Sequence, residues 1–482
     1  MLNNWRYGKD AATSNYTIND EYISTENLKK HLDSSDIAYK SFTVGGYTLC
    51  LVYAEGLINQ TLVDECIVKP LVLHYNDKID GVRELAQRIT SGMICHAIAA
   101  ERTLMAELAG DILNGFTAIV SDDLRRAYTY ELKGQTMRAI SEAENESSVK
   151  APKDSFIEIL RVNTSLIRSR IRTPDLKIEQ FTIGTQGGVA AAIVYMGSLA
   201  DQVILNELRE RVSSIEEDIH CAGAFEERII DRPYSIFPQT IFTERPDKLC
   251  SNVSDGKIGI LIEGLPFAYI VPAVFGMFMQ TPEDYSNSSI SATIFRIIRY
   301  ACIITAVILP GFFVSICTYN QECLPTELAK SIIRSKEGIP FSMYAEMIFF
   351  ITAFEILLES GTRLPKTIGH SIPIIGGLVI GQAAVQAKFV SPSVVIIAAV
   401  AGIAGFVIPN HDMFNSMRLC RIFLTLCGCV YGLFGIAAGC IILMLHMTSL
   451  ESFGVPYMTP FTSNDGRNIE RDTFARQSFG KR

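Results

Sequence analysis

Acidic residues in one apolar stretch are the side chains of this sequence with the clearest chemical potential. Residues 343–360 are mostly apolar but contain Glu346, Glu355 and Glu359. A carboxylate that faces lipid at mid-depth costs roughly 2.5–3.5 kcal/mol, so these three should face protein, water or an end of the helix. Glu355 and Glu359 are four residues apart and share a helical face. Two interpretations stay open for that face: packing against a neighbour's backbone or arginine, or lining a water-filled path.

A second group of candidates lies in the apolar stretch 374–387. Leu378, Gln382 and Val385 follow i, i+4, i+7 spacing on one helical face. If identical subunits surround an axis, this face gives apolar rings, which close a pore by dewetting, and a polar amide, which eases ion passage. Plain helix packing with Gln382 bonded to a neighbour is the alternative, because an adjoining face carries small residues that let helices approach closely. The small residues are Gly377, Gly381 and Ala384.

Signatures of catalysis are missing. The sequence has no G-x-x-x-x-G-K-[ST], no H-E-x-x-H, no G-x-S-x-G and no strand-bound G-x-G-x-x-G. Its seven histidines are scattered, and the cysteines of the first 257 residues have no C-x-x-C spacing. We therefore expect free thiols, no metal, no cofactor and no enzyme.

The distribution of charge divides the chain into two parts. Its 482 residues have 20% charged residues and a mean hydropathy of +0.23, which fits neither a soluble enzyme nor a pure membrane bundle. The first 257 residues carry dense mixed charge, whereas four later runs contain no Asp, Glu, Lys or Arg. The runs are 300–321, 371–387, 389–410 and 422–445. Because crossing about 30 Å of hydrocarbon needs such lengths, we expect an α-helical multi-span membrane domain over 300–447.

Net charge and the first residues indicate partners and location. A net charge of −8 and a pI near 5.5 argue against nucleic acid, because phosphate binding requires clustered basic side chains. The chain begins MLNNWRYGKDAATSN, without the apolar stretch of a signal peptide, so we expect the N-terminal domain to stay in the cytoplasm. Residues 1–19 and 448–482 are then the two tails, and membrane lipid is a partner.

The soluble part is typical of two tandem, duplicated α/β subdomains. Residues 42–65 and 181–207 stay in register once 184–186 are treated as an insertion, and both predict strand, glycine turn, apolar strand, loop and amphipathic helix. Tyr53 and Tyr195 are one of the matched pairs. The predicted parts are subdomain 1 (20–140), a polar linker (141–153) and subdomain 2 (154–264).

The end of the second copy bears on the membrane boundary. Turn signals at 114–115 and 255–256 each precede an apolar strand, and the second of these strands places Glu263 in the soluble domain, near the membrane. The apolar stretch 266–279 that follows has 14 residues and is too short to span. We expect it to form an interfacial elbow helix within residues 265–299.

The number of spans stays open at four, five or six. With the elbow and five spans, seven basic residues lie inside and four outside, whereas six spans give five and six, so the positive-inside rule mildly prefers five. Five spans would put the basic tail after Arg467 outside, and four would return it to the cytoplasm. The seven are Lys257, Arg296, Arg299, Arg363, Lys366, Arg418 and Arg421.

A series of uncommon strings in a fixed order is more specific than any one of them. Together they strongly resemble the A subunit of the GerA family of bacterial spore germinant receptors, over about residues 150–460. The strings include SFIEILR (155–161), FPQ (237–239), TERPD (243–247), EDY (283–285), LPT (324–326), IPF (339–341), FEIL (354–357), RLP (363–365), GLVIGQAAV (377–385) and SFGVPY (452–457).

The resemblance implies a receptor of three parts in the spore inner membrane. A permease-like B subunit would bind the nutrient, and a C subunit would be a lipoprotein. The A subunit would form a homo-oligomer that acts as a cation channel and opens when nutrient binds. Many relatives have Asp-Gly where this chain has Glu263-Gly264, and Glu-Ala-Gly where it has Glu359-Ser360-Gly361. These changes keep charge and small size, and the nutrient stays unassigned.

Candidates for coupling or interface contacts are Glu244, Arg245, Asp247 and Arg363. Segment 243–247 has three interpretations: a structural role between subdomains or subunits, coupling of the soluble domain to the pore, or a surface turn in which Glu244 and Arg245 pair. Arg363 is by default a basic anchor at a helix end.

Three functions follow from these observations. The first is a nutrient-gated channel subunit that triggers germination. The second is a secondary transporter with a regulatory soluble domain. The low number of spans and the lack of a membrane repeat argue against it. The third is a membrane scaffold that does not conduct and only holds the other subunits.

Overall fold

The chain divides into two units that interleave along the sequence. The computed structural model describes residues 22–74, 79, 81–90, 94, 100–134, 146, 152–185, 187–217, 221–362, 381–459, 461 and 462. The sheet unit comprises Met1–Ile230 and Thr240–Pro272, and the helical unit comprises Asp231–Gln239 and Ala273–Arg482. The chain therefore passes between the units three times.

The first sheet of the sheet unit has five antiparallel strands in the order β1-β2-β4-β5-β3. Leu51 and Tyr53 of the second strand enter one apolar core, and Val52 and Ala54 enter another. Both faces of this strand are therefore buried, which explains its continuous apolar sequence. The strands are β1 (Ile37–Val44), β2 (Tyr47–Ala54), β3 (Ala100–Arg102), β4 (Thr117–Ser121) and β5 (Arg126–Tyr130).

Helices line both cores of this sheet. One core receives Leu28 and Leu108, and the other receives Val63, Leu71 and Leu85. The soluble region is thus α/β, with a sheet between helical layers. The helices are α1 (Thr25–His31), α2 (Gln60–Val63), η1 (Asp64–Val68), α3 (Lys69–Leu73), α4 (Val82–Arg88) and α5 (Met105–Leu113).

The second sheet repeats the strand order of the first, as β6-β7-β9-β10-β8. Tyr53 lies opposite Ala38 in the first hairpin, and Tyr195 lies opposite Lys177 at the corresponding place in the second. This is the arrangement that a duplication predicts. The strands are β6 (Leu176–Ile183), β7 (Val189–Met196), β8 (Ile241–Thr243), β9 (Ile258–Ile262) and β10 (Ala268–Val271), and the helices are α6 (Leu160–Arg170), α7 (Gln202–Ser213), α8 (Ala222–Ile229) and α9 (Pro246–Ser254).

The two turns predicted at 114–115 and 255–256 are helix ends. Gly115 follows α5 and Gly256 follows α9, with φ values of 84° and 91°. This left-handed backbone is the usual way in which a glycine ends a helix. Each turn therefore connects a helix to the strand that follows it.

The elbow helix predicted within residues 265–299 is wrong. Its apolar stretch contains β10, which pairs with β9 on one side and with β8 on the other. Subdomain 2 therefore continues beyond residue 264. A buried strand and an interfacial helix are equally apolar, so hydropathy alone did not distinguish them. The remaining elements here are η3 (Phe275–Met279) and α10 (Pro282–Ser286).

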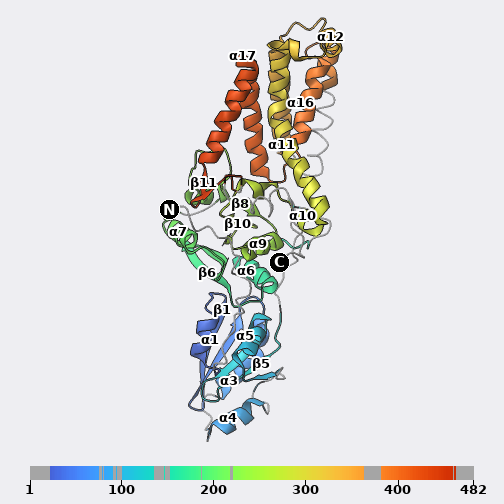
Figure 1. The fold of residues 1–482 in the computed structure, drawn as a ribbon. Helices are drawn as coiled ribbons and strands as arrows, with labels where there is room; N and C mark the ends of the chain where they lie inside the picture. Colours follow the sequence, from blue (N-terminus) through green and yellow to red (C-terminus); the bar gives the residue numbers. More distant parts are fainter. Residues whose placement is uncertain are drawn as a thin grey trace. The chain divides into compact units, whose positions relative to one another are not determined.

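The helical unit is built from apolar helices. Within the described residues, α11 (Ser289–Thr318) and α17 (His411–Ser449) are long and apolar enough to cross a membrane, and α16 (Pro392–Gly405) is a shorter apolar helix. Figure 1 shows α11 beside α16 and α17, which it also contacts. The first of these helices begins 11 residues before the predicted boundary at residue 300. Other elements are η4 (Gln321–Cys323), α12 (Thr326–Ser335), α13 (Met343–Thr362), β11 (Glu451–Ser452) and β12 (Val455–Pro456).

Helix α17 is a hairpin of two helical arms, as Figure 1 shows. Gly432 has φ 63° and ψ −145°, a conformation open essentially to glycine alone. A Cβ on Gly439 would lie 2.6 Å from Cδ2 of Leu424, although 15 residues of straight helix would separate them by about 22 Å. The apolar run 422–445, predicted as one span, is therefore broken inside.

Helix α11 and Tyr319, the residue directly after it, contact the chain near the break. The hydroxyl of Tyr319 donates to the carbonyl oxygens of Cys429 (2.7 Å) and Val430 (3.2 Å). The hydroxyl of Ser315 donates to the carbonyl oxygen of Gly428 (3.2 Å). These contacts satisfy carbonyl groups near the turn, which an apolar environment would otherwise leave unpaired.

Candidate coupling and pore residues

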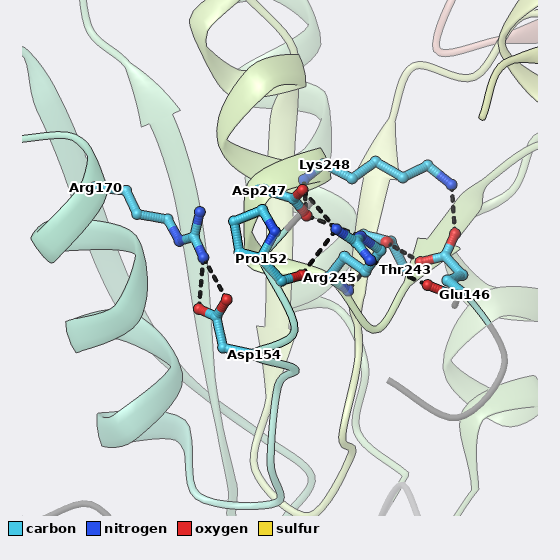
Figure 2. A network of polar contacts seen from close by, with 8 residues as sticks. All are labelled: Glu146, Pro152, Asp154, Arg170, Thr243, Arg245, Asp247 and Lys248. Carbon is cyan, nitrogen blue, oxygen red and sulfur yellow. Dashed lines mark hydrogen bonds and ion pairs between the residues drawn. The ribbon is translucent and has the colours of Figure 1, made fainter. Parts of the chain in front are cut away.

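A buried arginine organises segment 243–247 (Figure 2). The side chain of Arg245 is 2% exposed. Its Nε and Nη2 donate to the two carboxylate oxygens of Asp247 at 3.0 and 2.8 Å. Its Nη1 donates to the carbonyl oxygen of Glu146 (3.1 Å), and Nη2 also donates to that of Pro152 (3.0 Å). Pairs of this bidentate kind fix geometry as well as charge.

The same network holds the residues that precede the second sheet. The carboxylate of Glu146 accepts hydrogen bonds from the hydroxyl of Thr243 and from Nζ of Lys248. Asp154 accepts two hydrogen bonds from Nη2 of Arg170 at the end of α6. Figure 2 shows these groups around the start of α9. The arrangement joins three segments of the sheet unit.

The surface-turn interpretation of this segment is wrong, because Arg245 is buried and pairs with Asp247. Glu244 contributes its backbone carbonyl, which accepts a hydrogen bond from the backbone N of Phe156 (2.8 Å). The guanidinium of Arg245 already uses three of its nitrogens in protein contacts, so an added ligand would have to displace one of them.

Glu263 lies in the sheet unit, directly after β9. Its Oε2 accepts a hydrogen bond from the backbone N of Leu160 at 2.6 Å, in the first turn of α6. A carboxylate at a helix N-terminus satisfies an otherwise unpaired N–H and interacts favourably with the helix dipole. Its acidic character thus has a structural explanation.

Within the helical unit, Glu355 of α13 faces two arginines of the first arm of α17. Its Oε2 accepts a hydrogen bond from Nε of Arg418 (2.7 Å), and its Oε1 accepts one from Nη2 of Arg421. The exposed side-chain fractions are 15% for Glu355, 18% for Arg418 and 5% for Arg421. The arginine contact, one of the two interpretations left open for this carboxylate, is therefore present, and the lining of a water-filled path stays a prediction.

The other two glutamates of α13 differ from Glu355. Glu346 is 1% exposed, and its Oε2 accepts a hydrogen bond from the backbone N of Ser391 (2.8 Å). Its Oε1 lies 3.7 Å from Nζ of Lys336. Glu359 is exposed near the end of the helix. The three carboxylates therefore have three different environments.

Among the candidates for the pore face, Gln382 is exposed and Val385 is half-buried. A Cβ on the neighbouring Gly381 would lie 3.5 Å from a methyl group of Val395 in α16, so the glycine side of this segment is the packed side. Leu378 and Arg363 lie outside the described residues. Their roles stay predictions.

Sequence reasoning did not find a buried charge cluster at the start of α11. Asp284, whose side chain is 2% exposed, accepts hydrogen bonds from Nε of Arg296 (3.1 Å) and from Nη1 and Nη2 of Arg299 (2.7 and 2.9 Å). Burial raises the pKa of this carboxyl, but the hydrogen bonds and charge of Arg299 lower it more, and the net pKa lies below its ordinary value. The sequence feature that could have indicated this cluster is a pair of arginines three residues apart that follows an acidic segment.

Comparison with known proteins agrees with the resemblance seen in the sequence. The family described as Bacillus/Clostridium GerA spore germination protein matches residues 25–482. The uncharacterized membrane protein YfkQ of Bacillus subtilis (strain 168) is 36% identical over 457 residues, which cover 92% of this chain and 88% of that protein. Spore germination protein A1 of the same organism is 37% identical over 435 residues, with coverage of 90% and 89%.

A further relative and one solved structure extend this comparison. Spore germination protein KA of Bacillus subtilis (strain 168) is 33% identical over 453 residues, covering 93% of this chain and 83% of that protein. The crystal structure of the N-terminal domain of the A subunit of the Bacillus megaterium spore germinant receptor GerK3 matches with a TM-score of 0.40 at 24% identity, covering 53% of this chain and 96% of that one. By the extent of these sequence matches, the chain belongs to the GerA family of spore germination proteins.

Proposed function

We propose that this chain is a subunit of a nutrient germinant receptor and forms an oligomeric cation channel in the spore inner membrane. Its N-terminal domain would be cytoplasmic. Its partners would be further copies of itself, a permease-like B subunit and a lipoprotein C subunit. Membership of the GerA family supports the role in germination, since relatives that match most of the chain are named for it.

The exposed amide of Gln382, in a stretch without charged residues, carries the channel proposal. A primary amide that faces lipid loses its hydrogen bonds to water, which costs free energy unless another group replaces them. Gly381 beside it packs towards α16, so the amide points away from the packed side. Copies of the chain around an axis would turn Gln382 and Val385 into a pore lining. Leu378 would complete the face.

An even number of membrane crossings fits this geometry. The backbone N of Phe275, just before α11, donates to the carbonyl oxygen of Tyr457, just after β12, at 2.8 Å. Nη1 of Arg299 in α11 donates to the carbonyl oxygen of Met279 (2.9 Å). The start of the first apolar helix and the end of the last are therefore close together. Five crossings would put them on opposite sides of the membrane.

Ion flux from liposomes tests the proposal. We expect the full-length chain, reconstituted without other subunits, to release K⁺ from loaded vesicles. Gln382→Leu should reduce the flux, because the polar position in the pore face is lost. Ile396→Leu, at an exposed apolar position of α16, is the matched control and should leave it unchanged.

The rival functions give different results in the same experiment. A scaffold gives no flux in any variant. A transporter gives flux that saturates with a solute and follows the gradient of that solute. Flux that is equal in Gln382→Leu and the unchanged chain would remove Gln382 from the pore.

A further inference from the structure

Residues 231–239, here named the strap, lie between α8 and β8 in the sequence but belong to the helical unit. The side chain of Gln239 closes the strap: its Oε1 accepts a hydrogen bond from the backbone N of Arg232 (3.0 Å), and its Nε2 donates to the carbonyl oxygen of Arg232 (2.7 Å). The backbone N of Ser235 donates to the same carbonyl at 3.1 Å. Compact loops are commonly packed by their own side chains in this way.

The strap contacts both arms of α17 near their ends. The hydroxyl of Ser416, in the first arm, donates to the carbonyl oxygen of Ile236. Oγ of Ser235 lies 3.0 Å from Nε2 of His446, in the second arm. The ring of Phe237, which is 2% exposed, lies 5.7 Å from the His446 ring. The strap thus joins two helix ends that are about 30 residues apart in sequence.

The turn formed by β11 and β12 makes hydrogen bonds at each of the three points where the chain enters or leaves the helical unit. Oγ of Ser452 donates to the carbonyl oxygen of Gln239 (3.0 Å) and accepts a hydrogen bond from the backbone N of Ala273 (3.1 Å). The backbone N of Phe453 donates to Oδ2 of Asp231 at 2.7 Å. Asp231, Gln239 and Ala273 are the first or last residues of the helical unit at the three passages. Strings 237–239 and 452–457, both singled out in the sequence, meet here.

In the sheet unit, the chain on each side of the strap is held as well. The hydroxyl of Thr240 donates to the carboxylate of Glu226 in α8. Nη1 of Arg211 in α7 donates to the carbonyl oxygen of Ile229. Thr240 leads directly into β8, which is an edge strand of the second sheet. A shift of this sheet edge would therefore reach the strap through Thr240, the residue that joins β8 to it.

We propose that the strap couples the sheet unit to the α17 hairpin, with Phe237, Gln239 and His446 as positioning residues. A displacement of the edge of the second sheet would move the strap, and the strap would change the spacing of the two arms. The consequence for the pore rests on the channel function proposed above. The coupling itself does not, because it is a property of the folded chain.

A simple structural anchor makes a different prediction. If the strap only fixes the ends of the hairpin, changes in α17 alter the hairpin and leave the sheet edge as it was. If the strap couples the sheet edge to the hairpin, the effect is reciprocal: a change in the hairpin alters the sheet edge, and a change at the sheet edge alters the hairpin. Amide hydrogen exchange separates these cases because it reports local opening of each element.

The test uses the full-length chain in detergent with two matched pairs of variants. His446→Ala removes the contacts with Ser235 and Phe237, and it should speed amide exchange at 241–243 by about fivefold or more. Thr448→Ala is its control, because Oγ1 of Thr448 donates to the carbonyl oxygen of Leu445 within its own helix, and it should leave β8 unchanged.

The reverse pair starts from the sheet unit. Thr240→Val should speed exchange at residues 447–452 by a similar factor, since the hydroxyl bond to Glu226 is lost. Ser213→Ala is the control, because Oγ of Ser213 donates to the carbonyl oxygen of Glu210 in its own helix. Neither control should change exchange in the distant element.

The outcomes separate this inference from the proposed function. Faster exchange in both distant elements, with changed K⁺ flux, supports coupling and channel together. Faster exchange with no flux in any variant supports the coupling and overturns the channel. Unchanged exchange at 241–243 in His446→Ala overturns the coupling, whatever the flux.

Discussion

Replacing Glu355 with glutamine leaves Arg418 and Arg421 facing a neutral amide inside the helical unit. Removing one partner of a buried ion pair costs about 3–5 kcal/mol. Because the carboxylate and Arg418 keep 15% and 18% exposure, we expect the lower end of that range, about 3 kcal/mol. A carboxylate that faced lipid would give the opposite sign, since neutralising it would stabilise the chain by roughly 2.5–3.5 kcal/mol.

Thermal unfolding of the purified full-length chain in detergent measures this sign, and K⁺ flux measures the functional effect. We expect Glu355→Gln to lower the unfolding temperature and to change the flux or the assembly. Glu327→Gln is the control, because Glu327 is 88% exposed in its pair with Lys330 and should change stability by less than about 1 kcal/mol.

A double variant tests whether uncompensated charge is the cause. Arg421→Gln combined with Glu355→Gln should recover part of the loss, because it removes the more deeply buried of the two cations. Unchanged flux together with higher stability in Glu355→Gln would refute the placement of this carboxylate inside the unit.

Three further predictions concern other sites. Arg245→Met should lower the free energy of unfolding of the sheet unit by about 3 kcal/mol, the lower end of the range because Asp247 is 24% exposed, and tryptic cleavage after Lys153 should become faster. The folded pKa of Asp284 lies below its unfolded value, so its stabilisation is present above the unfolded pKa and is lost as pH falls through the folded one. In the unchanged chain, the unfolding temperature should therefore fall as pH is lowered from about 6 to 3, and in Asp284→Asn this fall should be smaller. Leu378→Ala should cause germination without nutrient at normal receptor abundance if it widens an apolar ring, whereas a packing defect of about 2–5 kcal/mol lowers abundance and response together. Normal abundance with no spontaneous germination would remove Leu378 from the pore.

Elements with strong local periodicity could be predicted from the sequence. Strand β7 is the apolar strand predicted within residues 181–207, and α7 is the amphipathic helix predicted to follow it. Strand β10 could not be predicted, because four buried residues carry no period and its partners β8 and β9 are set by the tertiary fold. The break at Gly432 was hidden for a related reason. A glycine in an apolar run is tolerated in a helix, and only its φ shows that the chain turns there.

Partner choice was the unpredictable part of the candidate sites. The sequence showed that Glu355 needed protein or water beside it, which the cost of burying charge dictates. It did not show that Arg418 and Arg421, more than 60 residues away, would supply that environment. Arg245 is a similar case, because its neighbour Glu244 was as plausible a partner as Asp247 until the backbone direction at the start of α9 was known.

The same pairings can be compared with the sequence argument about membrane topology. Arg418 and Arg421 pair with a glutamate of α13, and Arg296 and Arg299 pair with an aspartate of α10. Lys257 lies in the sheet unit and donates to the side chain of an asparagine in α9. The positive-inside rule concerns basic residues in loops near the membrane, and these five are bound to partners in folded elements. The rule counts basic residues and not net charge, so pairing with carboxylates leaves the mild preference for five spans in place. In the proposed channel, the hydrogen bond between the backbone N of Phe275 and the carbonyl oxygen of Tyr457 argues in the opposite direction, for an even number of crossings, and the number of spans stays a prediction.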